Sequence, residues 1–330
     1  MKEELIKRLM DSCGIRDQIR KIEPVSGGLM HRMYKVETEG GNYAVKHLNP
    51  NIMKRPDALA NYARAEKLEE MLQAYDIPIV PAMVIDGKRM QKIQDEYFYI
   101  FRWQEGQITD WKHIEEDMCF QVGTILGKIH AIEPKEGENQ SFAISRTDWG
   151  DYILKAKEEN IPSASLLEEN EDLLCYAQNE LNRARALLPA IMCISDEDMD
   201  PKNIMWDKGI PWVIDLECLD YGNPISHVLQ LALQWSGIVT GDFDVNKMNA
   251  FFKGYLQAYD NGFRNYSDIT GVAYTWIEWL EYNMQRALGA CTDEKECELG
   301  ISEVKSTMER IRYIREIEFE LKTALQMIAE

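Results

Sequence analysis

The sequence predicts an α+β fold of two lobes, an antiparallel-sheet lobe followed by a mainly helical one. Its 330 residues exceed the length of one ordinary domain, about 150 residues, and so favour two lobes. Before residue 103 the apolar residues gather in short strand-like runs between glycine turns, whereas after residue 104 they recur every three or four positions, as on helices. We therefore place the lobes at residues 1–103 and 104–330.

The first lobe is expected to contain five strands and one helix. The turn residues Ser26-Gly27-Gly28 and Gly40-Gly41 separate the first three strand-like runs. Good helix formers fill residues 57–75, and Pro78 follows, which ends a helix. The strands are expected at residues 21–25, 33–38, 42–48, 79–85 and 97–103.

Helices are expected throughout the second lobe. The clearest carries Val122, Ile125, Leu126 and Ile129 on one apolar stripe and ends near His130, which we interpret as a structural residue. The other helices are expected at residues 150–160, 166–188, 225–236, 245–259, 271–288 and 299–330.

The charge of the chain argues against two classes of partner. With 37 Lys+Arg against 56 Asp+Glu the net charge is −19, which disfavours a surface for nucleic-acid phosphates or for anionic membranes. No apolar run approaches the roughly 18 residues of a membrane span, and the start of the chain lacks the pattern of a secretory signal. We expect a protein that binds neither nucleic acid nor membrane, and its oligomeric state stays open.

The cysteines give no signal for a metal or for disulfides. The chain has seven of them, an odd number, and they are scattered along the sequence without metal-ligand spacing to the five histidines. We expect reduced thiols, a cytoplasmic location and no zinc site.

The stretch from Ile194 to Pro224 carries the most informative pattern. Asp198 is followed five residues later by Asn203, then by a short strand, a Lys-Gly turn, a second strand and Asp215. A hairpin of this kind holds an amide oxygen and a carboxylate close together, and these hard oxygen ligands suit Mg²⁺ that carries nucleotide phosphates. Asp198 precedes the hairpin and is placed to accept a proton from a substrate hydroxyl. Acidic residues in a turn are usually only solvated. Features of the first lobe therefore have to decide whether this pattern is a functional site.

Lys46 supplies a complementary charge in the first lobe. A strand lysine usually faces solvent, but one downstream of a glycine turn can reach nucleotide phosphates as a point charge. The turn Ser26-Gly27-Gly28 would let backbone N–H groups approach those phosphates without obstruction. Glu66, in the following helix, is either a surface glutamate or the residue that pairs with Lys46 and holds it extended.

Taken in chain order, these features resemble one family. The glycine turn, the strand lysine, the helix glutamate and the acidic hairpin are similar to those of the aminoglycoside phosphotransferase and choline kinase group of small-molecule kinases, which share the protein-kinase-like fold. The resemblance covers the chain from about residue 20 to residue 290. Its most specific parts are Asp198-Met199-Asp200-Pro201-Lys202-Asn203-Ile204-Met205-Trp206 and Val213-Ile214-Asp215.

The resemblance implies a role for each of these positions. Asp198 would be the catalytic base, and Asn203 and Asp215 would bind Mg²⁺. Lys46 would hold the α- and β-phosphates, with Glu66 as its partner. Catalysis would then consist mainly of positioning and charge neutralisation.

The same resemblance implies the remaining nucleotide contacts. Trp103, Gln104 and Glu105 would form the hinge for adenine, and Ser26, Gly27 and Gly28 would cover the phosphates. The implied cofactors are ATP or GTP with Mg²⁺. The implied activity is transfer of the γ-phosphate to a hydroxyl of a small molecule, with residues 1–103 binding nucleotide and residues 104–330 carrying catalysis and acceptor binding.

One position departs from the family pattern. Asp196 stands where family members usually have a histidine, two residues before the catalytic aspartate. An added carboxylate near Asp198 and Asp215 is expected to raise a pKa or to strengthen metal dependence. The departure keeps open a nucleotide-binding pseudokinase that acts as a scaffold or sensor, and a purely structural helical protein is a third alternative.

Other residues have two interpretations. Glu217, two residues after Asp215, is either a second carboxylate at the metal or only lies on the same side of the chain. Trp276, Trp279 and Tyr282 recur at helical spacing, which indicates core packing more often than a site for a quaternary ammonium group.

The acidic charge is concentrated in the second lobe. Residues 1–103 hold 17 basic and 15 acidic residues, whereas residues 104–330 hold 20 basic and 41 acidic ones. This imbalance favours a cationic acceptor, such as an aminoglycoside, an amino sugar or an amino alcohol, although acidic helical surfaces are also common in soluble proteins.

Overall fold

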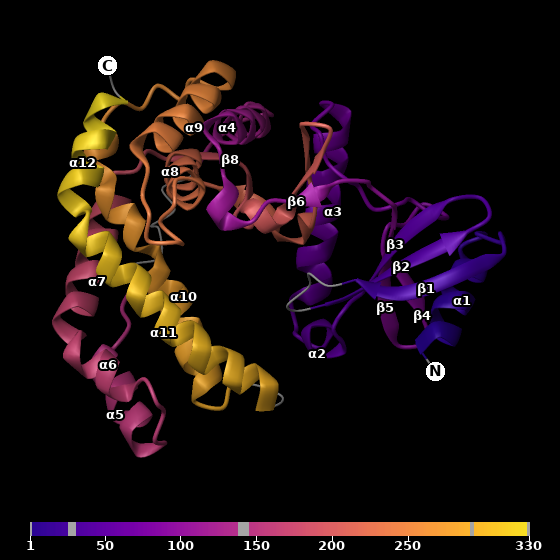
Figure 1. Ribbon diagram of the computed structural model, residues 1–330, viewed down its shortest axis with the longest axis horizontal. Helices are drawn as coiled ribbons and strands as arrows, with labels where there is room; N and C mark the ends of the chain where they lie inside the picture. Colours follow the sequence, from indigo (N-terminus) through magenta and orange to yellow (C-terminus); the bar gives the residue numbers. More distant parts are fainter. Residues whose placement is uncertain (1, 26–30, 138–144, 291–293, 329–330) are drawn as a thin grey trace. The chain divides into compact units, whose positions relative to one another are not determined.

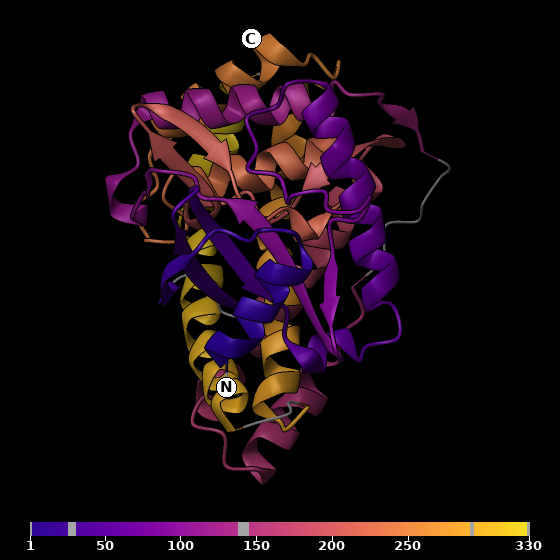
Figure 2. The same ribbon diagram turned by 90° about the vertical axis from the view of Figure 1, so that its right-hand side faces the viewer.

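The computed structural model describes residues 2–25, 31–137, 145–290 and 294–328. Its elements confirm the predicted α+β class, with an antiparallel sheet in the N-terminal region and mostly helices in the remainder (Figures 1 and 2). In the described ranges, no helix has both the length and the apolar character needed to cross a membrane.

The chain forms two compact units. The first unit consists of Met1–Thr109 and Asp196–Asp220, and the second of Asp110–Ser195 and Tyr221–Glu330. The first unit therefore contains the N-terminal sheet together with the acidic hairpin around Asp198. The functional division after residue 103 stays a prediction.

The first unit is built on a five-stranded antiparallel sheet (Figure 1). Its spatial order is β1 (Ile19–Val25), β2 (Arg32–Thr38), β3 (Asn42–His47), β5 (Glu96–Arg102) and β4 (Gln91–Ile93). Lys46 pairs in register with Met33 on one neighbouring strand and with Tyr99 on the other. Since directly paired residues project to the same face, Lys46 and Tyr99 share one face of the sheet.

Helices cover the two faces of this sheet. Helix α1 (Lys2–Ser12) packs Leu9 and Met10 against Val45 and its neighbours on one face. The short helix α2 (Pro50–Met53) leads into α3 (Ala58–Ala74), whose Tyr62 packs with Tyr99 on the face that carries Lys46. Alternation along the strands thus separates an apolar layer from the layer of the charged lysine.

Residues 79–85 do not form the expected strand. They make only isolated bridges, among them Ile79 with Val213 and Ala82 with Phe101. Prolines at positions 78 and 81 lack the backbone N–H that a continuous strand ladder requires, so the apolar run crosses between sheets as an irregular segment. Helix α1 was also not anticipated from the sequence.

The expected hairpin is present and belongs to the first unit. A 3₁₀ turn, η2 (Pro201–Asn203), leads into β9 (Ile204–Asp207), which pairs with β10 (Ile210–Val213) and with the short β6 (Gln107–Ile108). Lys208 and Gly209 both have positive φ, at 51° and 80°. This is the conformation of a tight two-residue hairpin turn, as the Lys-Gly signal predicts.

The second unit is helical. Helices α4, α8 and α9 agree closely with the expected segments, whereas three long predicted helices are interrupted. Asn170 divides the expected helix 166–188, and its side-chain amide donates to the carbonyl oxygen of Leu166 at 2.7 Å, which competes with the helical backbone bond. The helical elements are η1 (Trp111–His113), α4 (Glu116–His130), α5 (Trp149–Glu158), α6 (Ala164–Glu169), α7 (Glu171–Ala186), α8 (Pro224–Trp235), α9 (Val245–Ala258), η4 (Tyr266–Thr275), α10 (Trp276–Ala287), α11 (Glu294–Glu316) and α12 (Glu318–Met327). The remaining short strands of the chain are β7 (Lys135–Glu136), β8 (Ile191–Asp196) and β11 (Leu219–Gly222). The turn η3 (Leu216–Cys218), which precedes β11, belongs to the first unit.

His130 is structural, as expected. It is fully buried in the second unit, where its ring nitrogens lie 2.9 Å from the Tyr255 hydroxyl and 3.0 Å from His227 Nδ1. Burial, with a smaller contribution from His227, holds the pKa of His130 well below its ordinary value. The ring is therefore neutral at physiological pH and serves the buried hydrogen-bond network.

The cysteines agree only in part with the expectation of reduced thiols. Cys13, Cys119, Cys175, Cys193 and Cys218 are free. Cys297 is disulfide-bonded, so the expectation is wrong at that position, and Cys291 lies outside the described residues.

Helices α4 and α9 pack through glycines that allow their backbones to approach. A Cβ atom added at Gly123 would lie 2.1 Å from the carbonyl oxygen of Phe251, and one at Gly254 would lie 2.1 Å from that of Phe120. The two glycines are thus reciprocal, each meeting the backbone of the other helix. The contact leaves no space for a methyl group.

We expect Gly123→Ala to lower the free energy of unfolding by about 1–3 kcal/mol, because the helices must separate to accommodate the added methyl group. Gly150→Ala is the matched control. It is also a helical glycine, but an added Cβ there would find its nearest neighbours at 3.4 Å, an ordinary contact. The control should be neutral or stabilising by up to about 1 kcal/mol. Urea denaturation measures both, and equal effects of the two variants would contradict the close helix contact.

Candidate active site

Lys46 is a buried cation held by two carboxylates. Its side chain is 7% exposed, and its Nζ lies 2.5 Å from Asp215 Oδ1 and 2.5 Å from Glu217 Oε2. Burial alone would lower the pKa of Lys46, but the charges of Asp215 and Glu217 outweigh it and raise that pKa above its ordinary value. The lysine is therefore charged, in contrast to the solvent-facing interpretation of a strand lysine.

Asp215 follows β10 in a strained backbone conformation. Its φ of 63° and ψ of 60° lie in the left-handed region, which a residue with a Cβ rarely adopts. Such strain persists only where the surrounding structure requires it, and it is often found at functional sites. Burial raises the pKa of Asp215, with Lys46 opposing and Glu217 adding to the shift.

Glu217 joins Lys46 to His31, the residue directly before strand β2. Its Oε1 lies 3.0 Å from His31 Nε2, while its Oε2 holds Lys46. Burial would raise the pKa of Glu217, yet the hydrogen bond from His31 and the charge of Lys46 hold it at about 2. Glu217 is therefore ionised throughout the physiological range.

Asp198 and Asn203 form the second part of the site. The Asn203 side-chain amide donates to the backbone oxygen of Asp198 at 2.8 Å, which binds the loop to the start of the hairpin. Lys202 Nζ lies 2.8 Å from Asp198 Oδ1 and 2.5 Å from Asp200 Oδ2. Burial, opposed by Lys202, raises the pKa of Asp200 to about 6. The ammonium of Lys202 thus offsets the negative charge of Asp198, the predicted base, and of Asp200.

Asp196 is buried beneath this loop. It is 1% exposed, and its Oδ1 accepts a hydrogen bond from the backbone N–H of Asp198 at 3.2 Å. Burial, reinforced by the charge of Asp198, raises the pKa of Asp196 well above its ordinary value. The added carboxyl group therefore keeps its proton to a higher pH than an ordinary aspartate does.

Glu66 is engaged elsewhere in the structure. Its Oε1 accepts hydrogen bonds from the Tyr99 hydroxyl at 2.9 Å and from the backbone N–H of Met90 at 3.1 Å. Tyr99 is the register partner of Lys46, so Glu66 lies on the face of the sheet that carries the lysine. The pairing of Glu66 with Lys46 stays a prediction, and the ammonium of Lys46 forms ion pairs with Asp215 and Glu217.

The predicted hinge follows β5. The backbone N–H of Trp103 donates to Asn42 at 3.0 Å, and the ring of Trp103 lies 4.6 Å from Lys35 Nζ. The Gln104 side chain donates to the carbonyl oxygen of Glu105 at 2.9 Å. Of the predicted phosphate turn, Ser26, Gly27 and Gly28 lie outside the described residues.

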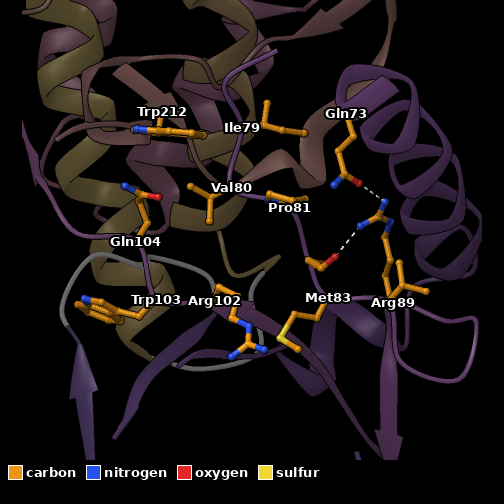
Figure 3. Close-up of a pocket in the computed structure, with 12 residues that line it drawn as sticks. Gln73, Ile79, Val80, Pro81, Met83, Arg89, Arg102, Trp103, Gln104 and Trp212 are labelled. Carbon is orange, nitrogen blue, oxygen red and sulfur yellow. Dashed lines mark hydrogen bonds between the residues drawn. The ribbon is translucent and has the colours of Figure 1, made fainter. Parts of the chain in front are cut away.

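A cavity of about 330 Å³ opens beside this hinge (Figure 3). The Arg89 guanidinium on one side donates to the carbonyl oxygen of Ala82 and to the Gln73 side chain. None of the described residues that line it belongs to the cluster around Lys46 or to the loop of Asp198. It is lined by Gln73, Ile79, Val80, Pro81, Ala82, Met83, Val84, Arg89, Arg102, Trp103, Gln104 and Trp212.

Sequence reasoning missed three contributors to the site. Lys202 was recognised only as part of a motif, although its spacing of four residues from Asp198 was a usable signal. His31 and Tyr62 have no spacing in the sequence that indicates their place in the site. His31 and Glu217 are separated by 186 positions in the sequence, so their contact lies beyond any local pattern.

A family comparison agrees with this geometry. The model of a phosphotransferase enzyme family matches residues 21–267, which is most of the chain. The chain belongs to the phosphotransferase enzyme family. Family membership confirms the predicted resemblance and the predicted enzyme class, a phosphotransferase of the small-molecule-kinase type. No curated protein sequence matches the chain.

Solved structures with the fold of this phosphotransferase span nearly its whole length. Spectinomycin phosphotransferase APH(9)-Ia, in complex with ADP and spectinomycin, aligns with a TM-score of 0.67 at 11% identity over 93% of this chain and 97% of its own. A choline/ethanolamine kinase family protein from Mesorhizobium loti aligns with a TM-score of 0.66 at 14% identity over 99% of both chains. Amicoumacin kinase hAmiN, in complex with AMP-PNP, Ca²⁺ and Ami, aligns with a TM-score of 0.57 at 15% identity over 94% of this chain and 96% of its own. These likenesses confirm the predicted kinase-like fold.

The raised pKa of Asp196 makes a testable contribution to the stability of this phosphotransferase. Its folded-state pKa is raised, so above the unfolded value near 4 the unfolded chain releases a proton that the folded protein retains, and stability falls as pH rises. Asp196→Asn removes this titration. The difference in unfolding free energy between wild type and variant should shift by up to about 1.4 kcal/mol per pH unit above pH 4, in favour of the variant. Chemical denaturation between pH 4.5 and 7.5 measures it, and a pH-independent difference would show that Asp196 is ionised.

Proposed function

We propose that this phosphotransferase moves the γ-phosphate of ATP or GTP to a hydroxyl of a small cationic molecule, with Mg²⁺ as cofactor. The acceptor class would include aminoglycosides, amino sugars and amino alcohols. The observation that carries the proposal is the presence of Lys46, Asp198, Asn203 and Asp215 in one compact unit, with Lys46 ion-paired to Asp215. This set provides a cation for phosphates, a base and two hard oxygen ligands.

The residues present fit a magnesium ion. Asn203 and Asp215 offer an amide oxygen and a carboxylate, and the backbone N–H of Ile214 donates to the carbonyl oxygen of Asn203 at 2.9 Å, which joins the two ligand positions. Mg²⁺, when bound, neutralises charge on the phosphate oxygens. Among the described residues no three His, Cys, Asp or Glu side chains form a metal-binding group. In the proposed site, nucleotide phosphates would supply further ligands, which is usual for Mg²⁺.

Asp198 would act on the acceptor hydroxyl. The acceptor oxygen forms a bond to the γ-phosphorus as the bond to the β-phosphate oxygen breaks, and the hydroxyl proton passes to Asp198. Lys202, 2.8 Å from Asp198 Oδ1, orients this carboxylate. Asp196, at the position where members of the resembled group usually carry histidine, supports the loop by accepting a hydrogen bond from the backbone N–H of Asp198.

Lys46 would hold the α- and β-phosphates. The other proposed nucleotide contacts are the hinge Trp103, Gln104 and Glu105, and the turn Ser26, Gly27 and Gly28. Glu66 is proposed as a further partner of Lys46 on the same face of the sheet. ADP in one structural neighbour and AMP-PNP with Ca²⁺ in another support a nucleotide and a divalent cation for this fold.

The charge of the chain supports a cationic acceptor. Residues 104–330 hold 41 acidic against 20 basic residues, whereas residues 1–103 are nearly balanced. An acidic surround raises the local concentration of a cation and speeds its encounter. Neighbours of the same fold include spectinomycin phosphotransferase and a choline/ethanolamine kinase family protein, which favours an amine-bearing hydroxyl compound. A cytoplasmic location is proposed with this role, since both nucleotides are abundant there.

A screen of Mg²⁺-dependent ADP or GDP release over aminoglycosides, macrolides, choline, sugars and amino alcohols tests the proposal. We expect turnover with an amine-bearing acceptor and faster turnover than with any neutral sugar.

Asp198→Asn should lower kcat by at least about a hundredfold, because the general base is lost, while nucleotide affinity stays within a few fold. An unchanged kcat would refute the role of Asp198, and a preference for a neutral sugar would refute the cationic acceptor.

A nucleotide-binding pseudokinase is the second candidate, and Asp196 at the family histidine position is the observation that favours it. Such a protein would show a nucleotide-induced rise in melting temperature without phosphate transfer to any acceptor. Against it, a protein that only binds nucleotide has no chemical need for Asp198 beside Lys46, Asn203 and Asp215.

A further inference from the structure

We infer that Glu217, oriented by His31, is the residue that holds Lys46 in position for the nucleotide phosphates, the role that the family resemblance implies for Glu66. The inference rests on the proposed function, because it concerns the same nucleotide site. It makes His31 a positioning residue for the lysine of strand β3.

The hydrogen bonds of His31 define its tautomer. The backbone N–H of Asn49 donates to Nδ1 at 2.9 Å, and a ring nitrogen that accepts carries no hydrogen. The hydrogen of the ring is therefore on Nε2, which donates to Glu217 Oε1 at 3.0 Å. His31 is 7% exposed, so its ring cannot turn toward solvent without breaking both bonds.

Glu217 uses each of its oxygens for one partner. Oε1 accepts from His31, and Oε2 lies 2.5 Å from Lys46 Nζ. A carboxylate fixed at one oxygen presents the other in a defined direction, which orients the lysine ammonium. Asp215 shares the same ammonium through Oδ1, but the proposed function requires Asp215 as a metal ligand. Glu217, in contrast, has no proposed role as a metal ligand, so its carboxylate can serve to position Lys46.

Helix α3 supports this arrangement through Tyr62 rather than through Glu66. The Tyr62 hydroxyl lies 3.2 Å from His31 Nε2, and Tyr62 is one helical turn before Glu66 on the same helix. Glu66 meanwhile accepts hydrogen bonds from Tyr99 and from the backbone of Met90. Tyr62 thus places helix α3 against the ring of His31, whose Nε2 hydrogen is donated to Glu217.

The test compares His31→Ala with His31→Gln. Calorimetry measures the affinity for Mg²⁺ with AMP-PNP, and steady-state assays measure the nucleotide KM separately from kcat. We expect His31→Ala to weaken AMP-PNP binding and to raise the nucleotide KM about tenfold, because one charge-assisted hydrogen bond to Glu217 is lost. His31→Gln should recover most of the loss, since its amide N–H can still donate to Glu217. Glu217→Gln should weaken binding more than Glu66→Gln does.

His113→Gln is the matched histidine control, because the His113 side chain is 78% exposed. It should leave affinity and KM unchanged, and melting temperatures establish that each variant folds. Equal binding by His31→Ala and wild type would overturn the inference, as would a Glu66→Gln effect as large as that of Glu217→Gln. A His31→Ala loss that His31→Gln does not recover would also overturn it. A wild type that binds no AMP-PNP would overturn the proposed function together with the inference, whereas binding by the wild type with no acceptor turnover would overturn the transfer reaction alone.

Discussion

The site depends on one buried cation. Removing an ammonium from water costs several kcal/mol unless oppositely charged groups and hydrogen bonds replace the solvent. Around Lys46 this compensation comes from Asp215 and Glu217, and Glu217 is itself fixed by His31. Asp215 forms this ion pair from a backbone in the left-handed region, a conformation that residues with a Cβ rarely adopt. In the first unit, Lys46 thus joins the central sheet to the segment that follows the hairpin.

The electrostatics of the site separate its carboxylates into distinct states. A hydrogen bond and a cation lower the pKa of Glu217, whereas burial raises the pKa of Asp196. Asp200, with a pKa of about 6, lies between them because Lys202 partly offsets its burial. Several carboxylates can therefore share a small volume without all being charged, which limits their mutual repulsion and lets them serve different purposes.

The fold was predictable where the signal is local. The hairpin of Asn203 and Asp215 follows from its turn and alternating apolar residues, and its Lys208-Gly209 turn has the expected positive φ values. The strand predicted at residues 79–85 was wrong, because an apolar run alone does not distinguish a paired strand from a buried irregular segment. The expected helix 166–188 was wrong in its continuity, because the Asn170 side chain competes for a backbone carbonyl and ends one helix before the next begins.

The sequence by itself determined the chemical inventory of the site. The spacing of Asp198, Asn203 and Asp215 on one loop and hairpin is a local property of the chain, and it indicates oxygen ligands and a base without reference to the fold. The partner of Lys46 was decided only by the tertiary structure. Glu66 and Glu217 are chemically equivalent candidates, and the choice between them depends on which carboxylate the packing brings to the ammonium. That packing places Glu217 against His31 across 186 residues of chain, a distance over which sequence patterns carry no information about contact.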